Sequence, residues 1–151
     1  MSKFTVGDLA PDFSLEIAEG KTLSLENLRG KYVVLYFYPK DSTPGCTIEA
    51  RDFNSLKKDF TALGAEIIGV SKDPLTSHDK FRKNHDLQFY LGSDTKGDLC
   101  EKFSVWVEKS IHLHGIRDIS LLYYLFWKFS VHILLIPQLW FKTSFSDGLL
   151  Y

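Results

Sequence analysis

The sequence has few cysteines and little net charge. It contains two cysteines among 151 residues, too few for a disulfide-stabilised scaffold and typical of a reducing compartment such as the cytoplasm. Its 18 basic and 19 acidic residues leave a net charge of −1, so it lacks the basic excess of a nucleic-acid-binding protein. The length is enough for one domain with a sizeable core.

Other sequence features are missing as well. The first residues contain no apolar stretch of the kind that marks a secretory signal, so we expect no such segment. No set of cysteines and histidines has metal-site spacing, and no glycine-rich loop has the phosphate-binding pattern. The sequence therefore predicts neither a metal ion nor an organic cofactor.

The most informative stretch is the segment 31–53. Residues 32–38 are an apolar run rich in β-branched and aromatic side chains, which predicts a strand with both faces buried. Pro39 ends this strand because it has no N–H group to donate. A helix is then expected to begin with Thr43 as its N-cap and Pro44 as its first residue.

Cys46 falls in the first turn of that helix. Unpaired backbone N–H groups and the positive end of the helix dipole meet there and stabilise a thiolate. The sulfur would lie at the carboxyl end of a central strand, where open α/β sheets place their chemistry. The alternative is that Cys46 is a small buried hydrophobic residue, and its position alone does not decide between the two.

Pro39, Thr43 and Cys46 form the pattern P-x-x-x-T-x-x-C directly after the predicted strand. This pattern resembles the active-site motif of the peroxiredoxins. The wider segment 37–47 is similar to the bacterioferritin-comigratory protein, or peroxiredoxin Q, branch, and further matches run from about residue 7 to 110. The resemblance implies that Cys46 attacks the peroxide O–O bond and becomes a sulfenic acid. It also implies that Thr43 hydrogen-bonds the thiolate and a peroxide oxygen, while Pro39 shields the sulfur from water.

The resemblance implies a function for the chain as well. It is that of a thiol-dependent peroxidase that reduces hydrogen peroxide and organic hydroperoxides in antioxidant defence. The implied partners are the peroxide and a reductant: thioredoxin, glutaredoxin or a small thiol. A cytoplasmic monomer without cofactor is expected, binding neither nucleic acid nor membrane. The physical requirements agree, because peroxide reduction needs a thiolate, a donor for the leaving oxygen and a dry, aligned geometry.

The order of elements predicts the fold class. A hairpin over 11–25 precedes the central strand, and the helix from Pro44 is expected to run to Gly64. Most of its apolar residues have spacings that suit one helix face: Ile48, Phe53, Leu56, Phe60 and Leu63. Strands at 66–71 and 89–93 alternate with helices at 73–84 and 94–103. This order predicts an α/β, thioredoxin-like fold: a central mixed sheet flanked by helices, with an N-terminal hairpin and an atypical or incomplete C-terminal part.

The first departure from the family pattern concerns the second cysteine. Many members of the branch carry a resolving cysteine five residues after the first, where this chain has Arg51, or on the next helix, where it has none. Cys100 remains, and we favour a packing role over a resolving role for it. Arg51 either favours the thiolate electrostatically or is a solvated helix charge. His78 and His85 lie among charged residues, so we expect both at the surface.

The second departure is the segment 111–151, which we separate from a peroxiredoxin domain over 1–110. It contains five of the 37 charged residues but nine of the 22 aromatic ones. The family has a Gly-Ile-x-Arg-x-Thr-Phe strand here, followed by another strand and an amphipathic helix. The second active-site arginine of the family has no clear match, since Arg117 comes one residue too early.

Three interpretations of this segment remain open. It is a diverged completion of the sheet, a membrane-associated segment, or an out-of-frame translation that begins near Ser110. We favour the last, because charge and aromatic content change abruptly; a shifted reading frame of the gene should then encode a family-like strand. The alternative function is accordingly an inactive or impaired peroxiredoxin with an aggregation-prone or membrane-prone tail.

Overall fold

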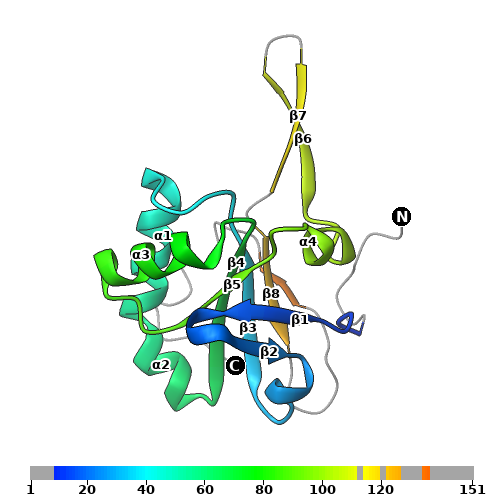
Figure 1. Ribbon diagram of the computed structural model, residues 1–151. Coiled ribbons are helices and arrows are strands. Elements are labelled where there is room, and N and C mark those ends of the chain that lie inside the picture. Colours follow the sequence, from blue (N-terminus) through cyan, green and yellow to red (C-terminus); the bar gives the residue numbers. More distant parts are fainter. Residues whose placement is uncertain (1–8, 112–113, 120–121, 127–133, 137–151) are drawn as a thin grey trace.

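A seven-stranded mixed sheet is the centre of the computed structural model, which describes residues 9–111, 114–119, 122–126 and 134–136 (Figure 1). In order across the sheet, the strands are β2 (Lys21–Ser24), β1 (Ser14–Ile17), β5 (Tyr90–Ser93), β4 (Ala65–Ser71), β3 (Tyr32–Phe37), β8 (Leu122–Phe126) and β9 (Leu134–Ile136). β3, β4 and β5 are parallel neighbours, and the other pairs are antiparallel.

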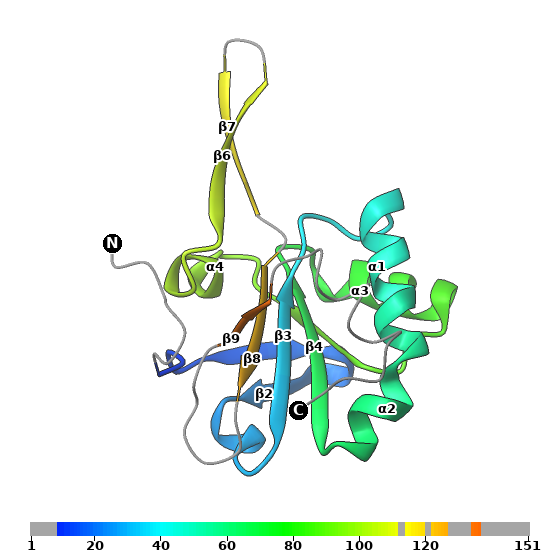
Figure 2. The same cartoon turned by 180° about the vertical axis from the view of Figure 1, so that it is seen from behind.

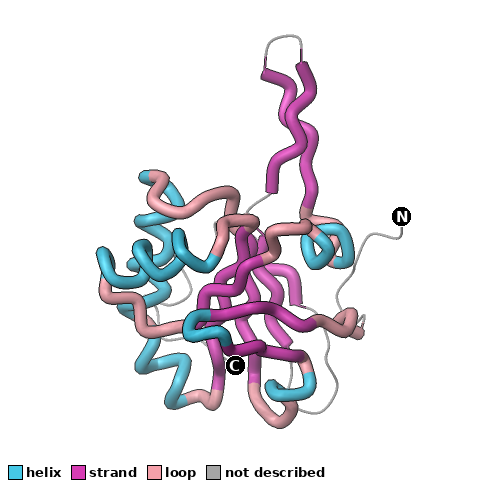
Figure 3. Tube along the Cα trace, viewed as in Figure 1, coloured by secondary structure: helices cyan, strands magenta, loops and turns pink. Residues whose placement is uncertain are grey.

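Helices cover both faces of this sheet (Figures 1 and 2). They are α1 (Pro44–Ser55), α2 (Lys57–Ala62) and α3 (Leu75–His85) on one face, and α4 (Asp98–Lys102) on the other. Two short 3-10 turns, η1 (Ala18–Gly20) and η2 (Glu26–Leu28), follow β1 and β2 (Figure 3). The predicted central mixed sheet with flanking helices and an N-terminal hairpin is therefore confirmed.

Strand β3 is buried on both faces, as its apolar run predicts. Val33, Leu35 and Phe37 belong to the core cluster that includes α4. Val34 and Tyr36 belong to the cluster on the opposite face, with α1, α2 and α3. Successive side chains of a strand point to opposite faces, so an apolar residue at every position is what a doubly covered strand needs.

The helix predicted from Pro44 to Gly64 is wrong as one element. α1 ends at Ser55 and α2 begins at Lys57, with Leu56 between them in a turn at the edge of the helical region (φ −92°, ψ 0°). Cys46, Ala50 and Phe53 form the buried face of α1. Of the five apolar residues considered for one helix face, Phe53 and Phe60 are buried, whereas Ile48 and Leu63 are 59% and 53% exposed.

Strands β6 (Trp106–Ile111) and β7 (His114–Ile119) form a separate antiparallel hairpin that extends away from the body (Figure 1). β7, β8 and β9 come from the segment 111–151. β8 pairs with β3 from Val33↔Phe126 to Phe37↔Leu122, and β9 pairs with β8. The division of the chain at residue 110 stays a prediction. None of the helices in the described ranges is both long enough and apolar enough to cross a membrane.

Candidate active site

Cys46 lies at the start of α1, at the carboxyl end of β3. Thr43 is the N-cap residue with extended backbone (φ −79°, ψ 150°), and Pro44 is the first helical residue, as predicted. Cys46 follows in the first turn and is 7% exposed. It belongs to the buried cluster that also contains Tyr36 and Phe53. The sulfur thus combines a helix N-terminus with low water access, a combination that suits a nucleophile needing both a stabilised anion and a dry approach.

Thr43 and Pro39 share the loop that leads into α1. The hydroxyl of Thr43 donates a hydrogen bond to the carbonyl oxygen of Lys40 at 3.1 Å and does not cap the helix. The carbonyl oxygen of Thr43 accepts from the N–H of Thr47 at 2.9 Å. Pro39 is half-buried in the same loop. The three predicted site residues therefore lie on one strand–loop–helix unit, and the roles assigned to them stay predictions.

Asp41 anchors this loop to two other parts of the fold. Its backbone N–H donates to Oδ2 of Asp73 at 2.8 Å, and the Ser71 hydroxyl donates to the same oxygen at 2.8 Å. Its carboxylate accepts from the Tyr38 hydroxyl at 2.7 Å and faces Nδ1 of His78 at 2.9 Å. Burial opposes ionisation, but the hydrogen bonds from His78, Tyr38 and Ser77 outweigh it and hold the pKa of Asp41 below its usual value.

The surface position predicted for His78 is wrong, because its side chain is 1% exposed. The predicted α3 is correct, but His78 lies on its buried face together with Phe81. The charged residues around it in sequence point elsewhere, and the partner that makes burial possible, Asp41, is remote in the chain. His85 is half-buried and its ring packs edge-on against Phe81, with 5.2 Å between centroids.

Glu49 is a residue of the site region that the sequence interpretation missed. It lies on α1 one turn after Cys46, and burial, with a smaller contribution from Asp52, raises its pKa to about 7. Its Oε2 is buried and lacks a hydrogen-bond partner among the described residues. A carboxyl group with a pKa near neutral, one helical turn after Cys46, is a candidate for proton transfer. The three-residue spacing from Cys46 on a predicted helix could have identified it.

Cys100 lies on the other side of the sheet from Cys46. It is fully buried in the cluster that contains α4, and its backbone N–H donates to Oδ2 of Asp94 at 2.9 Å. Burial, followed by a hydrogen bond to Asp94, raises the pKa of the Cys100 thiol far above its usual value. The packing role favoured from the sequence agrees with this environment. Arg51 is exposed on α1, which favours its interpretation as a solvated charge.

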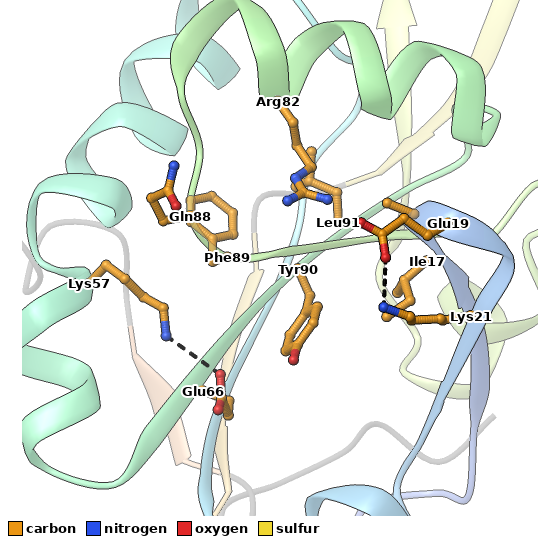
Figure 4. Close-up of a pocket in the computed structure, with 11 residues that line it drawn as sticks. Ile17, Glu19, Lys21, Lys57, Glu66, Arg82, Gln88, Phe89, Tyr90 and Leu91 are labelled. Carbon is orange, nitrogen blue, oxygen red and sulfur yellow. Dashed lines mark hydrogen bonds and ion pairs between the residues drawn. The ribbon is translucent and has the colours of Figure 1, made fainter.

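A surface pocket of about 310 Å³ lies away from these residues, between α3, β5 and η1 (Figure 4). Several charges at its rim are already paired: Lys57 lies 3.5 Å from Glu66, and Lys21 lies 2.6 Å from Glu19 (Figure 4). Its lining includes none of Pro39, Thr43 and Cys46. The three predicted site residues therefore lie outside this pocket.

Comparison with known proteins decides the family. The model of the AhpC/TSA family matches residues 6–123. The chain belongs to this family of peroxiredoxins. It is 50% identical over 101 residues to Peroxiredoxin Bcp of Bacillus subtilis, a match spanning 67% of this chain and 64% of that protein. With Peroxiredoxin Bcp of Escherichia coli it shares 37% identity over 125 residues, spanning 81% of this chain and 80% of that protein.

Solved peroxiredoxin structures share its fold. A cysteine-to-serine mutant of Xanthomonas campestris peroxiredoxin Q superposes with a TM-score of 0.81 at 33% identity, covering 90% of this chain and 88% of that one. BcpB of Mycobacterium tuberculosis gives a TM-score of 0.78 at 29% identity, covering 95% and 92%. The predicted family and the thioredoxin-like fold class are confirmed. The peroxiredoxins are peroxidase enzymes.

Proposed function

We propose that this peroxiredoxin is a thiol-dependent peroxidase with Cys46 as its nucleophile. The observation that carries the proposal is the position of Cys46, in the first turn of α1 and directly after the loop that holds Pro39 and Thr43. A structural study of the X. campestris relative concerns its alkyl peroxide reduction activity. We therefore extend the substrates to hydrogen peroxide and organic hydroperoxides.

The oxidation step follows from the chemistry of these groups. The Cys46 thiolate attacks one peroxide oxygen, an S–O bond forms as the O–O bond breaks, and the leaving oxygen departs as water or an alcohol after taking a proton. Thr43, once its hydroxyl turns from the Lys40 carbonyl oxygen, can hydrogen-bond the peroxide. Glu49, which exchanges its proton near pH 7, is a candidate source of the proton.

The reduction step needs a thiol from outside the chain. Cys46 and Cys100 lie in core clusters on opposite faces of the sheet, and position 51 carries arginine. A reductant thiol would attack the Cys46 sulfenic acid and release water, and a second thiol would then break the mixed disulfide and restore Cys46. Thioredoxin, glutaredoxin and small thiols fit this step. The two free cysteines suit the cytoplasm, and a monomer suffices for the cycle.

The alternative function is an impaired peroxiredoxin, and one observation favours it. Arg117, the arginine nearest to the position of the family's second active-site arginine, lies on β7, whose backbone pairs with β6 at Glu108. That hairpin is a sheet of its own, separate from the strand that leads to Cys46. A site that lacks one preorganised donor typically loses about 10²–10³ in rate.

Stopped-flow measurement of peroxide consumption tests the proposed function. The purified chain should consume one equivalent rapidly and then turn over when a thiol is supplied. Cys46→Ser should abolish both phases, whereas the matched variant Cys100→Ser should retain the first. Equal loss in both variants would refute the assignment of the nucleophile. A slow first phase in the unaltered chain that still depends on Cys46 would support the impaired alternative.

A further inference from the structure

A buried polar cluster joins the loop before α1 to β3 and α3. It consists of Tyr38, Asp41 and His78, each no more than 5% exposed. Tyr38 follows β3, Asp41 lies in the loop before α1, and His78 lies on α3. We propose that His78 and Asp41 are a positioning pair that fixes the loop 39–43 and thereby aligns the Thr43 hydroxyl with Cys46. This inference rests on the proposed function.

The hydrogen bonds give each member a definite role. An ionised carboxylate only accepts, so Nδ1 of His78 must carry the proton and donate to Asp41 at 2.9 Å. The Tyr38 hydroxyl donates to the other carboxylate oxygen at 2.7 Å. The pKa of Asp41 lies below its usual value, which agrees with a carboxylate that stays charged although buried. His78 and Tyr38 together compensate the charge that burial would otherwise disfavour.

The same residue holds the loop through its backbone. The Asp41 N–H donates to Asp73, which is itself bonded to Ser71 at the end of β4. Ser42, the next residue, has a positive φ of 59°, a conformation that non-glycine residues adopt only when their surroundings impose it. Asp41 is thus held by hydrogen bonds to both its side chain and its backbone N–H, immediately before the strained residue Ser42. Loss of its side-chain partners would let the carboxylate turn toward water and the loop relax.

Such relaxation would reach Thr43 before it reaches Cys46. Thr43 follows Ser42 directly, and its hydroxyl is bonded within the same loop, to Lys40. Cys46 is held in α1, whose buried face also contains Ala50 and Phe53. The pair therefore controls the alignment of the donor with the sulfur more than the placement of the sulfur. The leaving oxygen of a peroxide needs an aligned hydrogen-bond donor such as Thr43, whereas the iodide that leaves an alkylating agent needs none.

The test compares two reactions of the same thiol in His78→Leu and His78→Asn. Asparagine places an amide nitrogen as many bonds from Cα as Nδ1 of histidine, so it can still donate to Asp41. In His78→Leu, the rate of Cys46 oxidation by hydrogen peroxide should fall by about 10–100-fold, since a misplacement of about 1 Å can cost 10². Alkylation by iodoacetamide should change by less than about threefold, because the leaving iodide needs no hydrogen-bond donor from Thr43. His78→Asn should restore most of the oxidation rate.

Two further variants serve as controls for His78→Leu. His85→Asn removes the other histidine of α3, which lies outside the cluster and packs on Phe81, and should leave both rates unchanged. Tyr38→Phe removes one donor from Asp41 with little change in volume and should lower the oxidation rate by a smaller factor than His78→Leu. If His78→Leu fails to fold, the fall in Tyr38→Phe relative to the wild type is the test. Unchanged oxidation in His78→Leu and Tyr38→Phe, or a parallel fall of oxidation and alkylation, would overturn the proposal.

Hydrogen exchange separates this proposal from the proposed function. The amide of Asp41 should exchange about tenfold faster in His78→Leu than in His78→Asn, because its loop opens more often. An inert wild-type chain would refute the peroxidase function while this readout still reported on the loop. Equal exchange in the two variants would refute the positioning role whatever the activity.

Discussion

At the scale of single residues, burial divides the ionisable groups near the active site into opposite classes. Asp41 is buried with donors and is held as an anion, whereas Glu49 is half-buried, its Oε2 is buried without a partner among the described residues, and it binds its proton more tightly. The two carboxyl groups flank the first turn of α1 in sequence. Asp41 is suited to stabilising the loop, and Glu49 is suited to exchanging a proton.

Glu49 should make the stability of the fold depend on pH. Its pKa is about 7 in the folded protein against an ordinary value of 4.5, so the native state binds the proton more tightly than the unfolded state does. Stability should therefore fall as pH rises from about 4.5 to 7 and stay lower above that. Glu49→Gln should be more stable than the wild type at pH 8, by about 1–3 kcal/mol, after allowing for partial exposure.

Urea denaturation at pH 5 and pH 8 measures this effect. The exposed residue Glu16 supplies the control, and Glu16→Gln should leave the difference between the two pH values as it is in the wild type. The expectation for Glu49 fails if Glu49→Gln loses as much stability between pH 5 and pH 8 as the wild type.

The environment of Cys100 predicts the first oxidation product. After one equivalent of peroxide, intact mass should increase by one oxygen, or by one small thiol if that is present, because Cys100 is fully buried and strongly disfavours its thiolate. Cys100→Ser should give the same product. A loss of two hydrogens together with a linked Cys46–Cys100 peptide would show that the helix or the sheet rearranges enough to join them.

At the scale of elements, the packing of β3 against β4 depends on one glycine. A Cβ atom at Gly69 would lie 2.7 Å from the Tyr36 ring, which stacks on Phe53 of α1 with 4.5 Å between centroids. Gly69→Ala should therefore destabilise the fold by about 1–3 kcal/mol, as overpacking does. Gly45→Ala is the matched control, since a methyl group there would meet nothing within 4 Å. Thermal unfolding of both variants measures the difference in stability. Equal melting temperatures would mean that the Tyr36 ring moves aside without a cost in stability.

The elements show which features the sequence could predict. The strand β3 and the start of α1 follow from local chemistry: an unbroken apolar run, a proline without an N–H and a threonine before a proline. The break at Leu56 has no glycine or proline to mark it. The burial of His78 depends on Asp41, thirty-seven positions away, so no local pattern contains it. For the same reason, the loop that presents Cys46 was predicted while the groups that hold it were not.

At the scale of the whole molecule, the sheet extends on both sides of β3. β4 pairs with one edge of β3, and β8 pairs with the other over five residues. An unpaired edge at this central strand would expose backbone groups that promote association. β8 and β9 come from a segment with five charged residues among its many apolar and aromatic ones. The same segment thus extends the sheet while carrying a large apolar content.

This apolar content leads to a prediction about solubility and activity. We expect low solubility and weak peroxidase activity for the chain as written, because exposed apolar patches larger than a few hundred Å² promote association. Replacing residues 111–151 with a family-like ending, which carries the Gly-Ile-x-Arg-x-Thr-Phe strand and an amphipathic helix, should raise solubility. It should also raise the rate of Cys46 oxidation by about 10²–10³, the typical contribution of one preorganised donor.

The two gains can be separated with one further chimera. The same ending with glutamine in place of the grafted arginine should keep the improved solubility but lose most of the gain in rate, because its fold is retained while the positive charge is gone. Size-exclusion chromatography, thermal unfolding and stopped-flow oxidation of the three proteins give the comparison. If the unaltered chain is monomeric, unfolds cooperatively and reacts as fast as the arginine chimera, then strands β7, β8 and β9 are a working completion of the sheet. The segment 111–151 would in that case be a diverged part of the peroxiredoxin domain, and the boundary at residue 110 would have no physical basis.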